Sequence, residues 1–276
     1  MTSKKRVSRR AKAAATADKY ELYQQSVQEP EADVEFFKRV FKREFQRRPH
    51  LLREDFCGTG WLSCTWAADH PENVAHGYDI DPEPLAWGTA HNLPNIDASA
   101  RSRVSLLRGN ALRVMGPKFD IVAGLNFSYF CFKTREELGN YCKAGYRNLA
   151  GEGLFVLDIE GGKDTHSECR ETRKVGSYTY VWSQEKYNPI THHATCSIGF
   201  RFRDASEWKR AFTYDWRVWN LPEVRELMLD AGFERADVYW EGTDRKTDEG
   251  NGIFTRREVA EQCDAWIAYI VGVKRK

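Results

Sequence analysis

The chain has 276 residues, 41% hydrophobic and 30% charged, so it can bury a core and form one or two domains. Its 42 basic and 40 acidic side chains leave a net charge of +2, which argues against a surface built throughout for nucleic acid. Six of the first twelve residues are basic and none is acidic, so the rest of the chain carries a net charge of −4. Because like charges repel, we expect a disordered basic tail over 1–17 and a mildly acidic domain over 18–276.

The seven cysteines form no CxxC pair, so neither a disulfide framework nor a zinc site is predicted. No metal is expected at His192-His193, since neighbours on a strand point to opposite faces. No apolar run approaches the roughly 18 residues of a membrane span. We therefore expect a cytoplasmic protein, with a eukaryotic transit peptide as the alternative for the Arg-rich start.

The elements expected over 1–160 alternate between helix and strand. Helices are predicted at 20–45, 61–68, 85–93 and 135–149, and strands near 51–52, 74–80, 104–107, 119–125 and 154–159. This alternation is typical of βαβ units, so we predict an α/β fold with a doubly wound, mostly parallel sheet. Ligands bind such sheets beyond the carboxyl ends of the strands.

The pattern changes after Glu160. Residues 176–216 contain stretches of period two, which predict antiparallel strands and hence an insertion over about 160–216. A helix is then predicted at 221–231, a strand at 238–240, a polar loop at 243–252 and a last strand at 265–273.

Polar residues and glycines follow the predicted strands. Gly58 and Gly60 follow the first strand, Asp79 ends the second, and Asn110 and Asn126 follow the third and fourth. A glycine turn permits close backbone approach, and a carboxylate at the second strand can hold ribose hydroxyls. No GxGxxG or P-loop pattern is present, so the set indicates a nucleoside pocket without a polyphosphate.

These segments resemble motifs of the class I S-adenosylmethionine-dependent methyltransferases. The similar segments are Glu54-Asp-Phe-Cys-Gly-Thr-Gly60, Gly77-Tyr-Asp79-Ile-Asp-Pro82, Gly109-Asn110-Ala111, Phe119-Asp-Ile-Val122 with Asn126, and 149–156. The resemblance implies a Rossmann-like sheet of seven strands with one antiparallel strand in the last pair. It also implies S-adenosylmethionine as cofactor and S-adenosylhomocysteine as product.

The resemblance assigns a role to each matching residue. Gly58 and Gly60 would pass under the methionine part, and Glu54 would meet its ammonium group. Asp79 would hold the ribose. The full cofactor-binding set predicted in this way is Tyr20, Tyr23, Glu54, Cys57, Gly58, Gly60, Asp79, Ile80 beside the adenine, Asn110 at the adenine edge, Ala111 and Asn126.

Two residues depart from the family pattern. Phe56 stands where the first glycine of the loop is usual, and Asp55 stands where an apolar residue is common. Structural roles also remain open for the matching residues: a helix cap for Asp79, a turn for Asn110, a turn or cap for Asn126, an ion pair with Arg53 or Arg108 for Glu54, and packing for Cys57.

The segment Asn126-Phe-Ser-Tyr129 follows the fourth strand, where an acceptor would approach the methyl group. It is similar to the Asn-Pro-Pro-Tyr signature of amide and base N-methyltransferases, but Phe127 and Ser128 replace both prolines. No base flipping is therefore inferred. We predict Asn126 and Tyr129 as catalytic residues, with Ser128 as a further acceptor contact.

Two aromatic features have alternative interpretations. The helix that carries Tyr20 and Tyr23 either closes over the cofactor or only packs on the sheet. Five tryptophans between 182 and 240 either form a cage for a substituted ammonium or fasten the insertion to the sheet. Asp158 and Glu160 end the fifth strand, where they either touch substrate or cap the sheet.

The sequence thus predicts methyl transfer from S-adenosylmethionine to a small molecule, at an amine nitrogen, because the acidic domain disfavours a polyanionic acceptor. The partner expected is this small acceptor, with no membrane and no nucleic acid. Two alternatives stay open: a methyltransferase for RNA or protein recruited by the basic tail, and a non-catalytic module that binds the cofactor.

Overall fold

The computed structural model describes residues 12–244, 250–261 and 263–275. Its helices are α1 (Ala13–Thr16), α2 (Lys19–Val27), α3 (Pro30–Phe45), α4 (Trp61–Asp69), α5 (Pro82–His91), α6 (Ala98–Arg101), α7 (Arg135–Asn148) and α8 (Leu221–Asp230), with short 3-10 turns at Leu93–Asn95, Ser128–Cys131 and Asp164–His166. Among these residues, no helix is long and apolar enough to cross a membrane.

The strands form two sheets. They are β1 (Leu51–Asp55), β2 (Val74–Asp79), β3 (Val104–Arg108), β4 (Phe119–Gly124), β5 (Leu149–Gly161), β6 (Cys169–Val175), β7 (Tyr178–Asn188), β8 (His193–Phe202), β9 (Glu207–Arg217), β10 (Arg235–Thr243), β11 (Gly250–Arg256) and β12 (Trp266–Arg275). The large sheet has the order β11-β10-β12-β5-β4-β1-β2-β3, and the small one β6-β7-β8-β9. The predicted α/β fold and its antiparallel insertion are confirmed.

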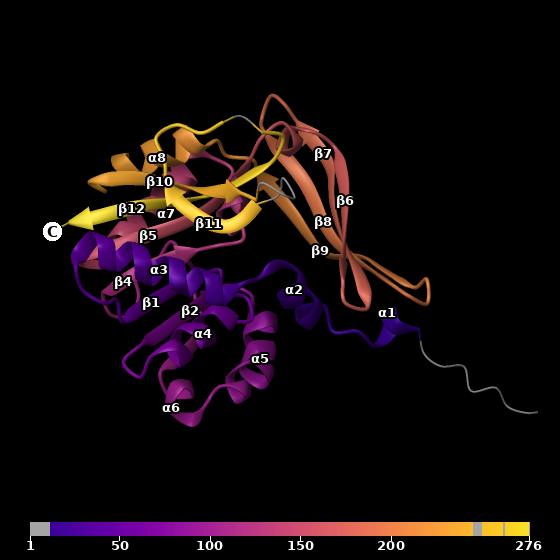
Figure 1. Cartoon of the computed structure of the whole chain (residues 1–276), viewed down its shortest axis with the longest axis horizontal. Coiled ribbons are helices and arrows are strands. Elements are labelled where there is room, and N and C mark those ends of the chain that lie inside the picture. The colour runs from indigo at the N-terminus through magenta and orange to yellow at the C-terminus, as the bar shows by residue number, and fades with distance from the viewer. Residues whose placement is uncertain (1–11, 245–249, 262, 276) are drawn as a thin grey trace, which may run out of the picture.

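The large sheet is buried on both faces, as parallel sheets usually are. Along β5, Phe155, Leu157 and Ile159 pack with α7 and α8, while Leu154 and Val156 pack with α3 and α4. The apolar run of β5 is continuous because helices cover both faces of the sheet at this strand. Figure 1 shows the small sheet standing to one side of this layered body.

Strand β11 is an addition to the seven predicted strands. It pairs antiparallel with β10 at the edge of the large sheet, and its first residues, 250–252, belong to the predicted polar loop over 243–252. Residues 245–249 of that loop lie outside the described residues. Its glycines, Gly250 and Gly252, favour a loop by composition, but backbone pairing with β10 holds the segment extended. The strand adds a wall beside the C-terminal end of β10.

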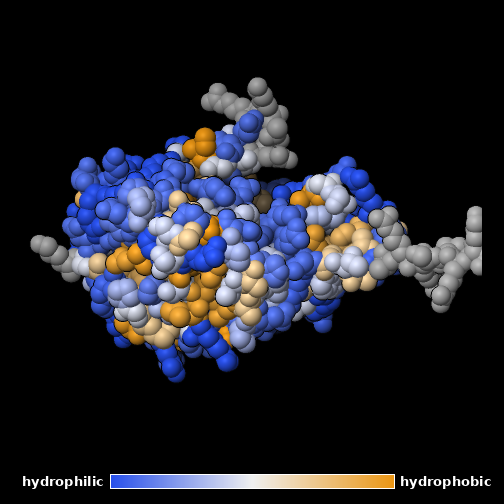
Figure 2. All heavy atoms as spheres, turned by 90° about the horizontal axis from the view of Figure 1, so that it is seen from below, coloured by the Kyte–Doolittle hydropathy of each residue, from blue (hydrophilic) through white to orange (hydrophobic). Residues whose placement is uncertain are grey.

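The predicted disordered tail over 1–17 needs correction where the structure describes it. Ala13–Thr16 forms α1, and the backbone N–H groups of Ala13 and Ala14 donate to Asp204 and Ser206 of the small sheet's β8–β9 turn. These bonds satisfy helix-start donors, which explains why the segment docks. Residues 1–11, with most of the predicted basic charge, lie outside the described residues. The small sheet and α1 form the lobe at the right of Figure 2.

Candidate functional site

The carboxyl ends of the parallel strands carry the residues that the sequence singles out. Strand β1 lies between β2 and β4. The chain therefore runs from β1 to β2 in one direction across the sheet and reaches β4 on the other side, which makes the β1–β4 boundary a topological switch point. Candidate nucleoside residues follow β1, β2 and β3, while the candidate acceptor residues follow β4 and β5.

The loop after β1 has the backbone of a glycine-rich turn. Phe56, Gly58 and Gly60 have φ values of 58°, 53° and 65°. Phe56 thus adopts the left-handed conformation that glycine would take, and its ring packs against Phe132 and Tyr141 at centroid distances of 6.0 and 5.5 Å. Phe56 therefore departs from the pattern in its side chain, while its backbone has a conformation that glycine adopts readily.

The other departure, Asp55, belongs to a buried ion pair. Its Oδ1 accepts from Nε of Arg53 at 2.7 Å, and both side chains are fully buried. Arg53 also donates to Oδ1 of Asn148 at 2.9 Å and lies over the Tyr78 ring, 4.4 Å from its centroid. Buried charges need such partners. Through these contacts, Tyr78 of β2 and Asn148 of α7 hold the end of β1, from which the glycine loop begins.

Asp79 ties the ends of β1 and β2 together. Its carboxylate accepts from the backbone N–H of Gly58 at 2.8 Å and of Asp81 at 2.9 Å. The helix cap considered for Asp79 belongs instead to Asp81, which accepts from the N–H of Glu83 at the start of α5. Ile80 beside it is 66% exposed, which is unusual for a large apolar side chain.

Glu54 and Cys57 are buried. Oε2 of Glu54 accepts from the backbone N–H and the hydroxyl of Ser63, at 2.9 and 2.6 Å, in the first turn of α4. Burial raises the pKa of Glu54 to about 8, against the effect of these bonds. Cys57 is only 2% exposed, and its backbone N–H donates to Tyr78. Glu54 thus pairs with Ser63 in place of Arg53 or Arg108.

Asn110 and Ala111 follow β3. Oδ1 of Asn110 accepts from the N–H of Leu112 at 2.9 Å, a turn contact that leaves its amide NH₂ group for other partners. Ala111 is buried. The N–H of Gly109 donates to the carbonyl of Asp79, so the two strand ends lie side by side.

A tight turn after β4 brings Asn126 to the β1–β4 boundary. Asn126 and Phe127 both have positive φ, 57° and 54°. The two oxygens of Asp158, on β5, accept their backbone N–H groups at 2.7 and 2.9 Å. Two consecutive left-handed residues are costly for non-glycine side chains, so Asp158 holds a conformation that would otherwise relax.

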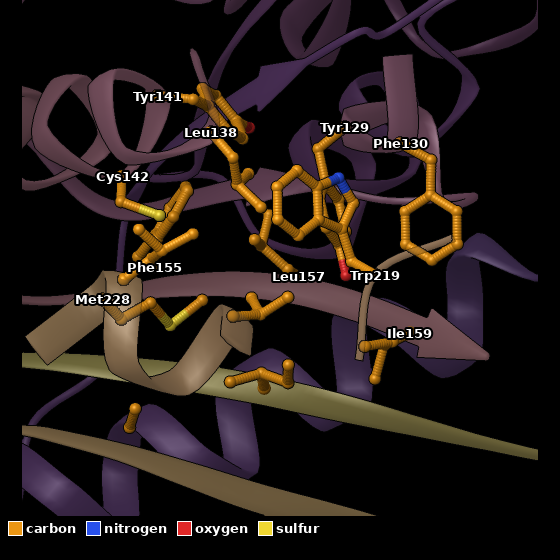
Figure 3. Close-up of a cluster of buried hydrophobic side chains, with 14 of the residues drawn as sticks. Tyr129, Phe130, Leu138, Tyr141, Cys142, Phe155, Leu157, Ile159, Trp219 and Met228 are labelled. Carbon is orange, nitrogen blue, oxygen red and sulfur yellow. The ribbon is translucent and has the colours of Figure 1, made fainter. Parts of the chain in front are cut away.

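Tyr129 lies away from this turn, in the core. It is fully buried beside Trp219 and Phe130, and its hydroxyl has no hydrogen-bond partner among the described residues (Figure 3). Burial raises the pKa of the Tyr129 hydroxyl well above its usual value. Tyr129 is not among the residues that line the cavity described below, so its position does not support the catalytic role predicted for it. Ser128 turns back to bond the carbonyl of Leu125.

Helix α2 bridges the glycine loop, α5 and the small sheet. Gln24 donates to the hydroxyl of Thr59 at 2.7 Å, and Asp18 accepts from Nε1 of Trp87 at 2.6 Å. Ser26 bonds Tyr178 of β7 at 2.9 Å. Sequence reasoning missed these side chains, because no local pattern marks contacts so distant along the chain.

The two tyrosines of α2 have different surroundings. Tyr20 packs between Trp87 and Phe212, at centroid distances of 5.6 and 6.0 Å. Tyr23 packs on Phe212 and lines a large cavity. Tyr20 thus holds α2 in place, and Tyr23 faces the interior that α2 helps to enclose.

The cavity measures about 630 Å³, a size typical of small-molecule sites. It lies between the start of α3, the C-terminal ends of β4, β5 and β10, strand β11, the start of β12, and one face of the small sheet. Seven carboxylates line it: Glu29, Asp33, Asp158, Glu160, Asp164, Glu171 and Glu241. Among the described lining residues, Arg173 is the sole basic side chain.

The small sheet covers the cavity with aromatic rings. Tyr180, Trp182, Tyr214 and Trp216 all line it, and the last three form a cluster with centroid distances of 4.5 to 6.1 Å. Strand pairing places them on one face, as the period of two predicts.

Burial perturbs three of the cavity carboxyls. It raises the pKa of Asp33 to about 7, of Asp158 to about 8 and of Glu160 to about 7, with Glu171 contributing repulsion at Glu160. Asp33 accepts a hydrogen bond from the Tyr269 hydroxyl. Carboxyls with pKa values near neutrality in a cavity are typical of functional sites.

A group of side chains that could ligate a metal lies at the opposite, N-terminal ends of the parallel strands. His50, His70 and Glu72 have ligand atoms within 4.8 Å of one another, before the starts of β1 and β2. They are at least partly exposed and far along the strands from the cavity, so they do not belong to the candidate site.

No family model and no curated protein sequence matches the chain. Solved structures do. An S-adenosylmethionine-dependent methyltransferase from Clostridium acetobutylicum ATCC 824 is 14% identical, covers 93% of this chain and 98% of its own, and gives a TM-score of 0.63.

Two further structures cover nearly the whole of both chains. CalS10, an amino pentose methyltransferase from Micromonospora echinaspora, is 17% identical over 92% of this chain and 97% of its own, with a TM-score of 0.63. DesVI from Streptomyces venezuelae is 15% identical over 92% and 96%, with a TM-score of 0.64. The chain therefore has the fold of S-adenosylmethionine-dependent methyltransferases.

Proposed function

We propose that the protein transfers a methyl group from S-adenosylmethionine to an amine nitrogen of a small molecule. The observation that carries this proposal is a juxtaposition. The glycine loop follows β1 and Asp79 ends β2, while β4, the neighbour of β1 on its other side, leads into Asn126, which lines an acidic and aromatic cavity. The neighbours in fold include an amino pentose methyltransferase and a sugar N-methyltransferase, KedS8, which agrees with an amine acceptor.

The residues after β1 and β2 fit the nucleoside and methionine parts of S-adenosylmethionine. A Cβ at Gly58 would meet nothing within 4 Å, so the loop has open space above it. Asp79 supplies acceptor oxygens for ribose hydroxyls beside that space, and the exposed Ile80 offers an apolar face for a base. Asn110 adds an amide NH₂ group at the third strand.

The bound cofactor supplies an electrophilic methyl group on a sulfonium. On transfer, the nitrogen lone pair would form the N–CH₃ bond, while the electron pair of the breaking S–CH₃ bond would return to sulfur. The protein's main task is to hold nitrogen, carbon and sulfur in line, which is worth roughly 7–11 kcal/mol. Asp158 serves this task as a positioning residue, because it fixes the turn of Asn126 and Phe127 that borders both halves of the site.

An amine attacks through the lone pair on its nitrogen, and an ammonium group has no free lone pair. An acceptor that binds as an ammonium ion must therefore first lose a proton. Asp33 and Asp158 line the cavity with pKa values of about 7 and 8. Carboxylates of this kind accept protons near neutral pH, where a carboxyl of ordinary pKa is a poorer base. We assign the proton transfer to these carboxylates, with Asn126 as a hydrogen-bonding contact of the acceptor.

Methyl transfer tests this function directly. The protein is incubated with S-adenosylmethionine and, separately, 1-aminobutane, 1,4-diaminobutane and 1-butanol, and products are detected by mass spectrometry. We expect methylated amines and no methylated alcohol. Asp79→Ala should lower turnover at limiting cofactor, whereas the exposed Asp230→Ala serves as the matched control. Binding of S-adenosylhomocysteine without methylation of any amine would contradict the proposal.

A further inference from the structure

The cavity extends well beyond the place where methyl transfer would occur, and its far part has a chemistry of its own. From the turn at Asn126 it continues along β5 past Glu160 to the small sheet, where Glu171, Tyr180 and Trp182 line it. This far part is large enough to hold a portion of the substrate other than the reacting amine.

Glu160 is a carboxylate without a partner. Its side chain is partly buried and lines the cavity, and no described residue bonds to it or pairs with it. Burying an unpaired carboxylate is costly, so an acidic side chain in this place points to a positively charged ligand.

Glu171 faces Glu160 from the small sheet. The two repel each other electrostatically, and Glu171 likewise has no ion pair among the residues that the structure describes. Glu171 is paired in register with Trp182, so both side chains leave the same face of the sheet. Acid and ring together form a wall on which a cation gains both charge pairing and contact with an aromatic face.

The one basic lining residue does not neutralise this pair. The guanidinium of Arg173 donates to the backbone carbonyl of Ser26, in α2, and lies over the Tyr180 ring, 5.7 Å from its centroid. Arg173 is therefore engaged by α2 and by an aromatic ring, on the same strand as Glu171.

We propose that Glu160 and Glu171, with the Trp182 ring, form a subsite for a second positive charge of the acceptor, so that the substrate class is a diamine or another dication. The subsite rests on the proposed function for the place of the reacting amine. Residues 158 and 160 on β5 are two positions apart, roughly 6–7 Å along the strand. A short aliphatic diamine spans this separation.

Calorimetry on the protein saturated with S-adenosylhomocysteine tests the subsite, with 1,4-diaminobutane and 1-aminobutane as probes. We expect the diamine to bind at least tenfold more tightly than the monoamine. Glu160→Gln and Glu171→Gln should each reduce this preference severalfold, while binding of 1-aminobutane stays within twofold. Glu207→Gln, an exposed acid on the opposite face of the same small sheet, should leave it unchanged.

The outcomes separate this inference from the proposed function. Equal affinity for the two amines, or a preference that survives both variants, would overturn the subsite. If the variants instead weaken S-adenosylhomocysteine by tenfold, the acids serve the cofactor, which also overturns it. If S-adenosylhomocysteine does not bind at all, the proposed function fails, and titration of the diamine into the protein alone still tests the subsite. Melting curves confirm that each variant is folded.

Discussion

Phe56 shows how a phenylalanine can occupy a left-handed backbone position, where glycine is the usual residue. A phenylalanine with a φ of 58° costs roughly 1–2 kcal/mol relative to an extended or helical conformation. The ring contacts with Phe132 and Tyr141 offset this cost. The resemblance in sequence located the loop, but only the packing beneath it explains why phenylalanine is tolerated.

The positive φ of Phe56 predicts an unusual order of stabilities at position 56. Phe56→Gly should be more stable than Phe56→Ala by about 1 kcal/mol, because both lose the ring and only glycine relieves the positive φ. Urea unfolding measures the difference. At Phe132, whose φ is −75°, the order should reverse. Equal stability of the two variants at position 56 would show that the backbone there is not strained.

Glu160 gives a prediction on pH. Its pKa is about 7 in the folded protein and about 4.3 in an unfolded chain. The folded state thus holds a proton that the unfolded state releases, so the contribution of Glu160 to stability falls as pH rises from about 4 to 7.

Glu160→Gln should therefore have the stability of the wild type near pH 4 and exceed it by about 1–3 kcal/mol at pH 8. Chemical unfolding without ligands at the two pH values measures this. Glu207→Gln should show no such trend. A Glu160→Gln protein that is less stable than the wild type at pH 8 would mean that the carboxylate has a structural partner.

At the scale of elements, helix α2 contacts both the glycine loop of the large sheet and the small sheet. Gln24→Ala removes its bond to Thr59 at the glycine loop. We expect faster hydrogen exchange of the α2 amides and severalfold weaker binding of S-adenosylhomocysteine, since the helix then covers the loop less firmly. Glu21→Ala, exposed on the same helix, is the control. Unchanged exchange in Gln24→Ala would show that other contacts position α2.

Most strands of the two sheets could be predicted because their signals are local. The apolar run of β5 and the alternation in β7 and β8 are visible in the sequence, and they follow from two-sided and one-sided burial. Strand β11 could not be predicted, because pairing with β10 and not its own composition makes it extended. The docking of α1 onto residues 204–206 depends equally on a distant partner.

At the scale of the whole molecule, the gathering of the residues that follow β1, β2 and β3 could be predicted, and the cavity could not. Gly58, Asp79 and Asn110 follow consecutive strands, so their meeting at one edge is a consequence of topology. The cavity draws acids from segments as distant as 29–33, 158–164 and 241, and nothing in the linear sequence brings these together. Tyr129 illustrates how far a local motif can predict a site. It belongs to a segment similar to a known motif, but its side chain is buried in the core.

The basic residues before α1 give a prediction at this scale. Deleting residues 1–11 removes five of the six positive charges at the start of the chain. Methylation of 1,4-diaminobutane should keep its rate and its salt dependence, because the site is built from residues beyond this segment. A severalfold, salt-sensitive loss would instead favour an acceptor that the basic segment recruits, such as RNA or an acidic protein.

The most direct test of the account is calorimetric titration of S-adenosylhomocysteine into the wild type, Asp79→Ala and the control Asp230→Ala. We expect micromolar binding to the wild type and the control, and at least tenfold weaker binding to Asp79→Ala, a loss of about 1.4 kcal/mol or more. Absence of binding to the folded wild type would contradict the nucleoside site and with it the proposed methyl transfer.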